Sequence, residues 1–428
     1  MTRRFAPDRR TFLKASAAAA LAAPTIVPSS VFGKPDAPAP SDRVVVGSIG
    51  LGGLGFGHHL KILLANNRVR VGAVCDVDRN HRDRAAQEVF DKTGDRVEIY
   101  KDFRDLCERP DVDAVLIATP DHWHALTAIY AMQSGKDVYC EKPLTLTIDE
   151  GKTMVETARR YGTVFQTGSQ QRSDKRFRKA CELVRNARIG KLERVDTYIG
   201  TSEAGHWQTA TTPPSELDWN FWLGPAPWAE YTPNRCHNEF RWFFDYSGGK
   251  MTDWGAHHND IAQWGIGADG SGPVKIKGAA KFHEKGPYEA PRTFDVTYTY
   301  ANGVELHCHA EGDNGVKFTG SDGWIFVNRS KINDSADGEI LKSKLTDQDV
   351  RLPVSKDHHD NWLDCIESRE RPICDVEVGH RSVTVCHLGN IAIRLGRELQ
   401  WDPVKEMFVN DEGANRMLSK PMRAPWHL

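Results

Sequence analysis

Three side chains in the stretch 248–260 predict a proton relay. Asp253 and His257 are four residues apart, and Asp260 follows three residues later. On a helix this spacing places the three side chains on nearly one face. A carboxylate can orient an imidazole, and histidine, with a pKa of about 6.5, passes protons near neutral pH. Two other interpretations stay open: Asp253 caps a helix in which His257 packs, or the three residues bind a metal. Because no cysteine or His-x-x-His pair accompanies them, we expect no metal.

A glycine-rich turn near the start of the chain predicts a dinucleotide site. Gly50-x-Gly52-x-x-Gly55 directly follows a short apolar run and precedes a helical segment. Glycines let the backbone turn tightly and approach a pyrophosphate, whose charge is met by the N–H groups at the helix start. A turn that only packs a helix on a strand is the alternative, because such glycine patterns are common.

The ends of two further apolar runs border the same crevice. Asp76 ends the second run, where a carboxylate accepts hydrogen bonds from both ribose hydroxyls, and Thr119 and Pro120 end the third. A carboxylate repels a 2′-phosphate, so we expect NAD rather than NADP. Arg79 and Arg82 are close enough in sequence to weaken that preference.

Lys142 is the candidate proton acceptor. It lies in Glu141-Lys142-Pro143, directly after another apolar run. Pro143 biases Lys142 away from helical dihedral angles, so its side chain can project from the carboxyl edge of the sheet. Burial beside a cationic nicotinamide ring would lower the lysine pKa from about 10.4 towards neutrality. An ordinary surface lysine before a turn proline is the alternative.

The elements that must position these residues form an α/β pattern over residues 41–170. Short β-branched runs alternate with segments of helical period, which predicts a doubly wound parallel sheet, a Rossmann domain. We expect strands at 44–49, 69–75, 114–118, 137–139 and 164–168, and helices at 79–92, 123–134 and 148–161.

The pattern changes in residues 171–428, where an α+β domain is expected. After a helix at 175–186, strands of period two are expected at 195–201, 293–300 and 304–310. They predict an open, mainly antiparallel sheet, whose free face could pack on a second copy of the chain to make a homo-oligomer. A helical segment at 359–398 is expected to pack back on the first domain. Aromatic residues between 219 and 244 are expected in the core or along a glycoside site, and His358 and His359 in solvent.

Residues 1–40 are typical of a twin-arginine export signal followed by a linker. Arg9 and Arg10 precede the weakly apolar stretch 15–23 and then a Pro, Ser and Ala-rich stretch. The apolar stretch is shorter than the roughly 20 residues that a bilayer requires. We therefore expect export to the periplasm without stable membrane insertion. A basic disordered tail is the alternative.

Composition limits the partners and the number of domains. A length of 428 residues predicts two domains. With 56 Lys and Arg against 58 Asp and Glu, the chain has no positive excess with which to bind nucleic acid. Nine cysteines, several of them in apolar runs, predict no disulfide framework.

Together, the motifs resemble a known family. The glycine turn, Glu141-Lys142-Pro143 and Asp253-x-Gly255-x-His257-x-x-Asp260 are similar in order and spacing to the glucose-fructose oxidoreductase, inositol dehydrogenase and MocA (Gfo/Idh/MocA) family. The resemblance spans nearly the whole chain after residue 40, and the last stretch, through Trp401-Asp402-Pro403, is similar to the exported branch of the family.

The resemblance implies a role for each site residue. Lys142 and His257 would handle the proton, and Asp253 would contact or orient them. Gln170, Gln171 and Arg172 would line the nicotinamide and substrate side. The full set of implied cofactor contacts is Gly50, Gly52, Gly55, Asp76, Thr119, Pro120, His124, Glu141, Lys142 and Gln170. The implied substrate contacts are Arg172, Trp254, His258 and Asp260.

Three functions are compatible with these residues. The first is NAD-dependent oxidation or reduction at a hydroxyl or keto group of a sugar or glycoside. The second is a glycosidase that oxidises the sugar transiently, eliminates the aglycone, adds water and reduces the sugar again. Scarce free NAD outside the cytoplasm favours this second function. The third is a dinucleotide-bound protein without catalysis, which would leave Lys142, Asp253 and His257 without a use.

Overall fold

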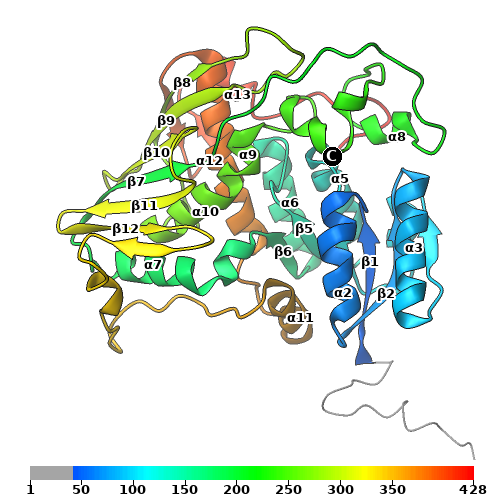
Figure 1. The fold of residues 1–428 in the computed structure, drawn as a ribbon, viewed down its shortest axis with the longest axis horizontal. Coiled ribbons are helices and arrows are strands. Elements are labelled where there is room, and N and C mark those ends of the chain that lie inside the picture. The colour runs from blue at the N-terminus through cyan, green and yellow to red at the C-terminus, as the bar shows by residue number, and fades with distance from the viewer. Residues whose placement is uncertain (1–41) are drawn as a thin grey trace, which may run out of the picture. The chain divides into compact units, whose positions relative to one another are not determined.

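The computed structural model describes residues 42–428, so the expected export signal and linker lie outside the described residues. The first sheet is parallel and six-stranded, in the order β3-β2-β1-β4-β5-β6 (Figure 1). Its strands are β1 (Val44–Ile49), β2 (Val69–Cys75), β3 (Glu98–Tyr100), β4 (Ala114–Ile117), β5 (Asp137–Glu141) and β6 (Phe165–Gly168). The strand order reverses between β1 and β4. A crevice therefore opens there at the carboxyl ends of the strands, where ligands of such sheets bind.

Helices connect these strands. They are α2 (Lys61–Ala65), preceded by a π-helical turn at Gly55–Leu60, α3 (Arg79–Thr93), α4 (Phe103–Cys107), α5 (Asp121–Gln133) and α6 (Ile148–Tyr161). Local sequence explains the ends of α6, because Thr147 and Glu150 form a capping box and Gly162 ends the helix with a left-handed φ of 65°. The alternating sequence thus gives the predicted Rossmann sheet. Strand β3 and helix α4 were not predicted.

A nine-stranded, mixed and mostly antiparallel sheet forms the second half, in the order β13-β12-β11-β7-β10-β9-β8-β14-β15. Its strands are β7 (Leu192–Tyr198), β8 (Lys275–Lys281), β9 (Thr293–Thr299), β10 (Glu305–His309), β11 (Gly315–Gly320), β12 (Gly323–Val327), β13 (Ile332–Asp334), β14 (Leu399–Asp402) and β15 (Met407–Phe408). Only β10 and β7 pair in parallel among the strand pairs of this sheet in residues 42–428. The predicted open sheet is therefore confirmed.

Helices cover one face of this second sheet. Helices α7 (Lys175–Arg185), α10 (Gly255–Ile266) and α12 (Val376–Leu395) pack against it, with α9 (Lys250–Asp253) preceding α10 (Figure 1). Alternate residues of β9, such as Val296 and Tyr298, are buried under these helices, while Thr297 on the other face is half-buried. Alternation of this kind is what a sheet with one covered face requires.

The C-terminal helices also contact the first sheet. Trp362 and Leu363 of α11 (His358–Ser368) join one of its apolar clusters, and Val376 and Val383 of α12 join another. A short helix, α13 (Glu412–Asn415), lies near the end of the chain. His358 and His359 were expected in solvent, and this expectation was wrong: both are 3% exposed, because they open a helix that packs on this sheet.

A segment at 200–247 crosses the carboxyl edge of the first sheet. It contains α8 (Trp219–Leu223) and two 3-10 turns, Pro233–Arg235 and His237–Trp242. Its aromatic residues make a small core of their own. It is attached beyond β2 by a bridge between Asp78 and Leu217 and by a 2.9 Å hydrogen bond from Arg79 N to Glu216 O. We call this segment the cover.

Two further features concern the cysteines and the hydropathy of the described helices. All nine cysteines lie within them, and each is buried and free of a disulfide. Searching residues 42–428 finds no helix with the length and apolarity to cross a membrane.

Candidate active site

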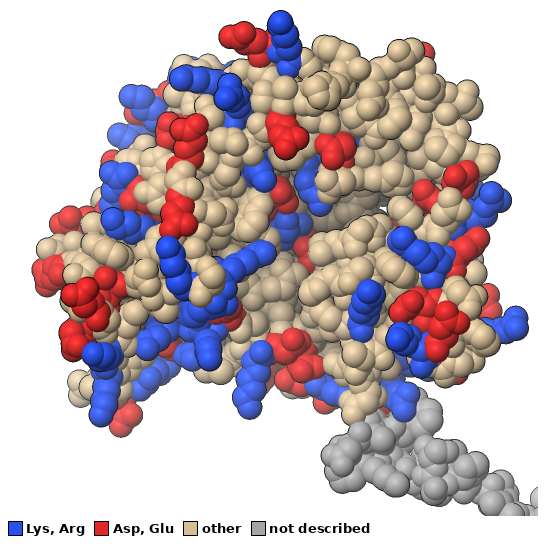
Figure 2. Space-filling model, in the orientation of Figure 1, with Lys and Arg blue, Asp and Glu red and all other residues tan. Residues whose placement is uncertain are grey.

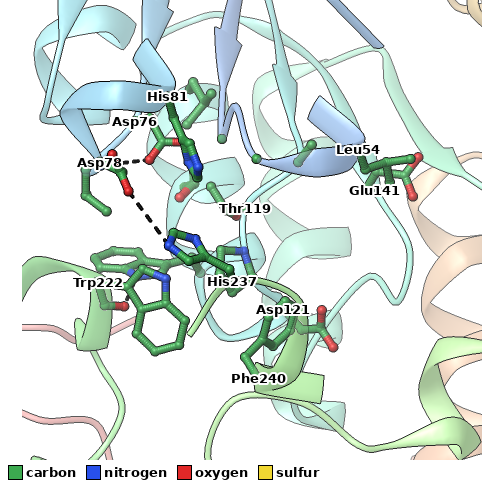
Figure 3. A pocket seen from close by; sticks show the side chains of 18 of the residues that line it. Leu54, Asp76, Asp78, His81, Thr119, Asp121, Glu141, Trp222, His237 and Phe240 are labelled. Carbon is green, nitrogen blue, oxygen red and sulfur yellow. Dashed lines mark hydrogen bonds and ion pairs between the residues drawn. The ribbon is translucent and has the colours of Figure 1, made fainter. Parts of the chain in front are cut away.

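A pocket lies at the carboxyl ends of β1, β2, β4 and β5, between the Rossmann sheet and the cover (Figure 3). Several residues expected at the cofactor line it: Gly50, Gly52, Asp76, Thr119, Pro120, Glu141 and Lys142. Asp253 of the expected proton relay also lines it, whereas His257 is not among the lining residues. Gly55, His124 and Gln170 are not among the lining residues.

Two of the three glycines in the turn leave no space for a side chain, and the third does. Gly50 has a φ of 83°, and a Cβ there would lie 2.6 Å from the Thr119 nitrogen. A Cβ on Gly55 would lie 1.9 Å from the carbonyl oxygen of Gly50. A Cβ on Gly52 would meet nothing within 4 Å. Gly50 and Gly55 are therefore needed to close the turn, and the backbone at Gly52 stays accessible to a pyrophosphate.

Two backbone N–H groups hold the Asp76 carboxylate at the pocket wall. Its Oδ2 accepts from Leu51 N at 2.7 Å and its Oδ1 from Asp78 N at 2.8 Å (Figure 3). Each carboxylate oxygen has a further lone pair, so both can still accept from ribose hydroxyls. His81 Nδ1 is 3.4 Å from Asp76. Burial by itself would lower the pKa of His81, but the hydrogen bond to Asp76 raises it.

Beside Asp76, three side chains come close enough to hold a metal ion. The ligand atoms of Asp78, His81 and His237 lie within 4.8 Å of one another, and His237 comes from the cover (Figure 3). These are not the residues weighed as metal ligands from the sequence. The structure does not bring Asp253, His257 and Asp260 together as one such group among residues 42–428.

Lys142 and Asp253 form an ion pair on the pocket wall. Lys142 Nζ is 2.8 Å from Asp253 Oδ1 and 3.3 Å from its backbone oxygen. Arg241 Nε, from the cover, is 3.7 Å from the same carboxylate. Burial alone would raise the pKa of Asp253, but Lys142 and Arg241 hold it below its usual value. Asp253 is therefore ionised at neutral pH.

This pairing corrects the expected relay. Asp253 was expected to orient His257, yet the described residues show no hydrogen bond between their side chains. The reason is that Asp253 ends α9, where its carboxylate meets the ammonium group of Lys142. The contact with Lys142 that the family resemblance implied is present.

His257 is a buried, neutral imidazole. It is 7% exposed, and its Nδ1 has no hydrogen-bond partner among the described residues. Burial, reinforced by the positive charges of Lys142 and Arg329, lowers the pKa of His257 well below its usual value. At neutral pH the ring is therefore uncharged, with one nitrogen that can accept a hydrogen bond.

A histidine that the sequence analysis did not single out holds Glu141. His59 Nε2 is 2.9 Å from Glu141 Oε1, and Gln170 Nε2 donates to the same oxygen at 2.7 Å. His59 Nδ1 is 3.0 Å from His359 Nε2 of α11. Burial by itself would raise the pKa of Glu141, but His59 and Lys142 lower it to about 2. The π-helical turn that carries His59 has no signature in the sequence, although it directly follows the glycine turn.

Arg172 and Asp260, expected to contact substrate, bind each other instead. Arg172 Nη2 is 2.8 Å from Asp260 Oδ1 and 2.8 Å from Asp269 Oδ1. Ser382 donates to Asp260 at 2.6 Å. Arg172 is 2% exposed and Asp260 0%, and neither lines the pocket. Burial would lower the pKa of Arg172, but the two carboxylates raise it well above its usual value. This cluster holds η4 (Gln170–Ser173) to α10.

Two other residues that were expected to contact a ligand, His258 and His124, make hydrogen bonds within the protein. His258 is fully buried, and its Nε2 is 3.0 Å from Asn314 Oδ1. His124 is buried between two backbone oxygens, 2.9 Å from that of Thr119 and 2.8 Å from that of Pro143. It joins two loops of the pocket without lining it. Trp254 is partly buried and packs against the apolar cluster between the second sheet and its helices.

The aromatic residues of the cover divide between the pocket, the core and the surface. Phe221, Trp222 and Phe240 line the pocket, and Trp219 and Phe243 are core residues. Trp228, also in the cover, is 63% exposed.

Comparison with known proteins agrees with this architecture. Residues 44–169 match the description "Oxidoreductase family, NAD-binding Rossmann fold", and residues 200–428 match "Oxidoreductase family, C-terminal alpha/beta domain". The WlbA dehydrogenase of Bordetella pertussis, solved with NADH and UDP-GlcNAcA, has a similar fold, with a TM-score of 0.63 and 17% identity. That likeness covers 84% of this chain and 99% of WlbA.

Two curated relatives are similar over shorter stretches. A glycosyl hydrolase family 109 protein of Shewanella baltica is 34% identical over 203 residues, 43% of this chain and 40% of the relative. The myo-inositol 2-dehydrogenase of Thermotoga maritima is 34% identical over 146 residues, 34% of this chain and 42% of the relative. The chain spans less than half the length of these relatives. On the strength of the two family matches, which cover the first sheet and most of the second, the chain belongs to the Gfo/Idh/MocA family of oxidoreductases.

Proposed function

We propose that the protein is an NAD-dependent oxidoreductase that oxidises or reduces a hydroxyl or keto group of a sugar or glycoside. The observation that carries the proposal is the Lys142–Asp253 ion pair on the wall of the dinucleotide pocket, at 2.8 Å. The relatives support the substrate class, because one is named for myo-inositol oxidation and WlbA was solved with a nucleotide sugar.

The pocket residues fit a nicotinamide dinucleotide. The open backbone at Gly52 suits the pyrophosphate, and the two oxygens of Asp76 suit the ribose hydroxyls. Asp76 favours NAD, because a carboxylate repels the 2′-phosphate of NADP. When bound, the nicotinamide supplies the hydride acceptor or donor.

The protein residues manage the proton. In the reducing direction, Lys142 Nζ donates its proton to the substrate oxygen. In the oxidising direction, Lys142 acts as a neutral amine, after losing a proton to solvent, and takes the proton of the substrate hydroxyl. His257, whose pKa is well below its usual value, takes part as a neutral hydrogen-bond acceptor. Asp253 keeps the Lys142 side chain in place through both directions.

The glycosidase alternative has support of its own, because several relatives are named glycosyl hydrolase family 109 proteins. In it, oxidation of a sugar hydroxyl acidifies the neighbouring C–H, the aglycone leaves by elimination, water adds, and the ketone is reduced again. We also propose twin-arginine export to the periplasm, on the basis of Arg9 and Arg10. Where free dinucleotide is scarce, a reaction that regenerates its cofactor has an advantage.

The test uses the purified full chain loaded with NAD. A panel of sugars and aryl glycosides is added while the reduced-nicotinamide absorbance and aglycone release are followed together. Growth of the absorbance without aglycone supports the dehydrogenase. Aglycone release with no net absorbance change supports the glycosidase. If no sugar or glycoside gives either signal, the proposed function is wrong.

A further inference from the structure

We propose that Arg329 is an anion-binding subsite that selects sugars carrying a carboxylate. This proposal rests on the proposed function and names its substrate class. Arg329 was not singled out from the sequence. It follows β12 and is exposed over part of its side chain, and Gln171 links its Nε to the backbone oxygen of His257.

Arg329 is held beside the turn that carries Asp253 and His257. Its guanidinium carbon lies 4.8 Å from the centre of the Trp254 ring. In the orientation of the Gln171 amide that satisfies both its ends, the nitrogen donates to His257 O at 2.9 Å and the oxygen accepts from Arg329 Nε at 3.2 Å. The stack and this hydrogen bond fix the direction of the guanidinium group, as a binding residue requires.

No carboxylate within residues 42–428 forms an ion pair with Arg329. The contrast with Arg172 is direct, because Arg172 is paired with both Asp260 and Asp269. Gln171 occupies only the Nε of Arg329, so the two terminal amino groups remain for a ligand. Partial burial lowers the pKa of Arg329, which means that the charge is partly desolvated and gains from an anion.

The charges nearby favour an anion on the substrate. Lys142, Arg241 and Lys250 all act on the single carboxylate of Asp253, whose nearest partner is Lys142. Asp253 and Glu141 also act on Arg329 and tend to raise its pKa, but neither forms an ion pair with it, and the effect of burial is larger. In Figure 2 the molecule is hollowed near its middle, with Lys and Arg as well as Asp and Glu side chains beside the hollow. Arg329 does not line the dinucleotide pocket, so the pyrophosphate of NAD is not the anion it would bind.

The geometry of the guanidinium points to a carboxylate. Two parallel N–H groups match the two oxygens of one carboxylate and balance its single charge. A phosphate monoester carries nearly two charges and would need further donors. The class of substrate is therefore a sugar acid, such as a uronic acid or its glycoside.

The test compares acidic with neutral sugars that differ only at one carbon. Methyl glucuronide is paired with methyl glucoside, and methyl galacturonide with methyl galactoside. Kd is measured by calorimetry on the NAD-loaded full chain, and reduction of the cofactor by absorbance. A charge-assisted bidentate contact predicts acidic sugars to bind about 10-fold to 100-fold more tightly than their neutral partners.

Variants separate the subsite from a general effect of charge. Arg329→Gln should abolish the preference and leave the Kd of neutral sugars unchanged, whereas Arg329→Lys should keep part of it. Arg371→Gln, at an exposed arginine between α11 and α12, is the matched control and should change neither Kd. Thermal unfolding of each variant checks that the fold is retained.

The outcomes distinguish this proposal from the proposed function. If neutral sugars bind and reduce the cofactor as well as acidic ones, and Arg329→Gln alters neither, the subsite is wrong and the oxidoreductase stands. If acidic sugars bind through Arg329 but no sugar changes the cofactor, the subsite stands and the oxidoreductase fails. If acidic sugars bind more tightly but Arg329→Gln keeps that preference, the subsite is wrong.

Discussion

Two carboxylates of a single motif have opposite environments in this protein. Asp253 lies at the pocket wall, 17% exposed, and pairs with Lys142, which is 13% exposed. Asp260, seven residues later, is fully buried and accepts from Arg172 and Ser382. The first pair stays accessible to a ligand, and the second is enclosed by protein.

The difference shows how one helical stretch can carry both a residue of the active site and a residue that holds the fold together. A proton-transfer group must remain able to change partners, so its ion pair stays open on one side. A buried charge without a partner is costly, and the Asp260 carboxylate accordingly accepts hydrogen bonds from Arg172 and Ser382. The Asp260 cluster fixes α10 against η4, and α10 in turn carries His257. Replacements in the two pairs should therefore separate turnover from stability.

The largest expected effect is on turnover at Lys142. Lys142→Met should lower the rate of cofactor reduction about 10²-fold to 10⁴-fold, because a positioned proton donor is removed. NAD binding and the free energy of unfolding should change little. Single-turnover absorbance measures the rate, with Lys61→Met at an exposed helix position as the control. Turnover close to that of the wild type would remove Lys142 from the mechanism.

The second effect is on stability at Arg172. Arg172→Met should lower the free energy of unfolding by about 3 to 5 kcal/mol, because it leaves Asp260 buried without its main partner. The same change at Arg68, whose partners Asp364 and Glu367 are exposed, should cost about 1 kcal/mol or less. Urea unfolding measures both. Equal losses in the two variants would contradict a special role for the buried cluster.

A third carboxylate, Glu141, sharpens the comparison because it is buried like Asp260 yet lines the pocket like Asp253. Its folded pKa of about 2 is below its ordinary value of 4.5. A lowered acid pKa stabilises the fold above the unfolded pKa, and this stability is lost as pH falls from about 4.5 to about 2.

Glu141→Gln should therefore be less stable than the wild type near pH 7 by about 3 kcal/mol, with the difference shrinking towards pH 2. Urea unfolding across this range measures the difference. Glu193→Gln, at an exposed strand position, should follow the wild-type curve. A constant gap at every pH would mean that the Glu141 charge contributes no stability.

The sequence predicted those parts of the molecule whose signals are local. The glycine turn and the strands beside it follow from periodicity and from the steric needs of Gly50 and Gly55. Strand β3 escaped prediction because it has three residues whose side chains are exposed or half-buried, which leaves no apolar pattern.

The partners of the site residues were harder to predict because they are distant along the chain. Helical spacing suggested His257 as the partner of Asp253, but the ammonium group that it binds belongs to a residue 111 positions away. Asp260 likewise finds Arg172 at a separation of 88 residues. The sequence thus supplied the identity of the reacting groups, while tertiary packing decided which of them meet.

The smallest expected effect on stability belongs to Asp253, and it tests the comparison most directly. Asp253→Asn keeps the size of the side chain but removes the charge that holds Lys142 at 2.8 Å. Because this pair is partly accessible and Arg241 remains nearby, unfolding should become easier by only about 1 kcal/mol. Asp260→Asn should cost several times more, since its site has no solvent to replace the charge. In single-turnover absorbance, Asp253→Asn should slow cofactor reduction about 10-fold to 100-fold, because a misplaced Lys142 loses the geometry for proton transfer. If Asp253→Asn destabilised the fold as much as Asp260→Asn, both carboxylates would be structural, and the division between an open and an enclosed ion pair would fail.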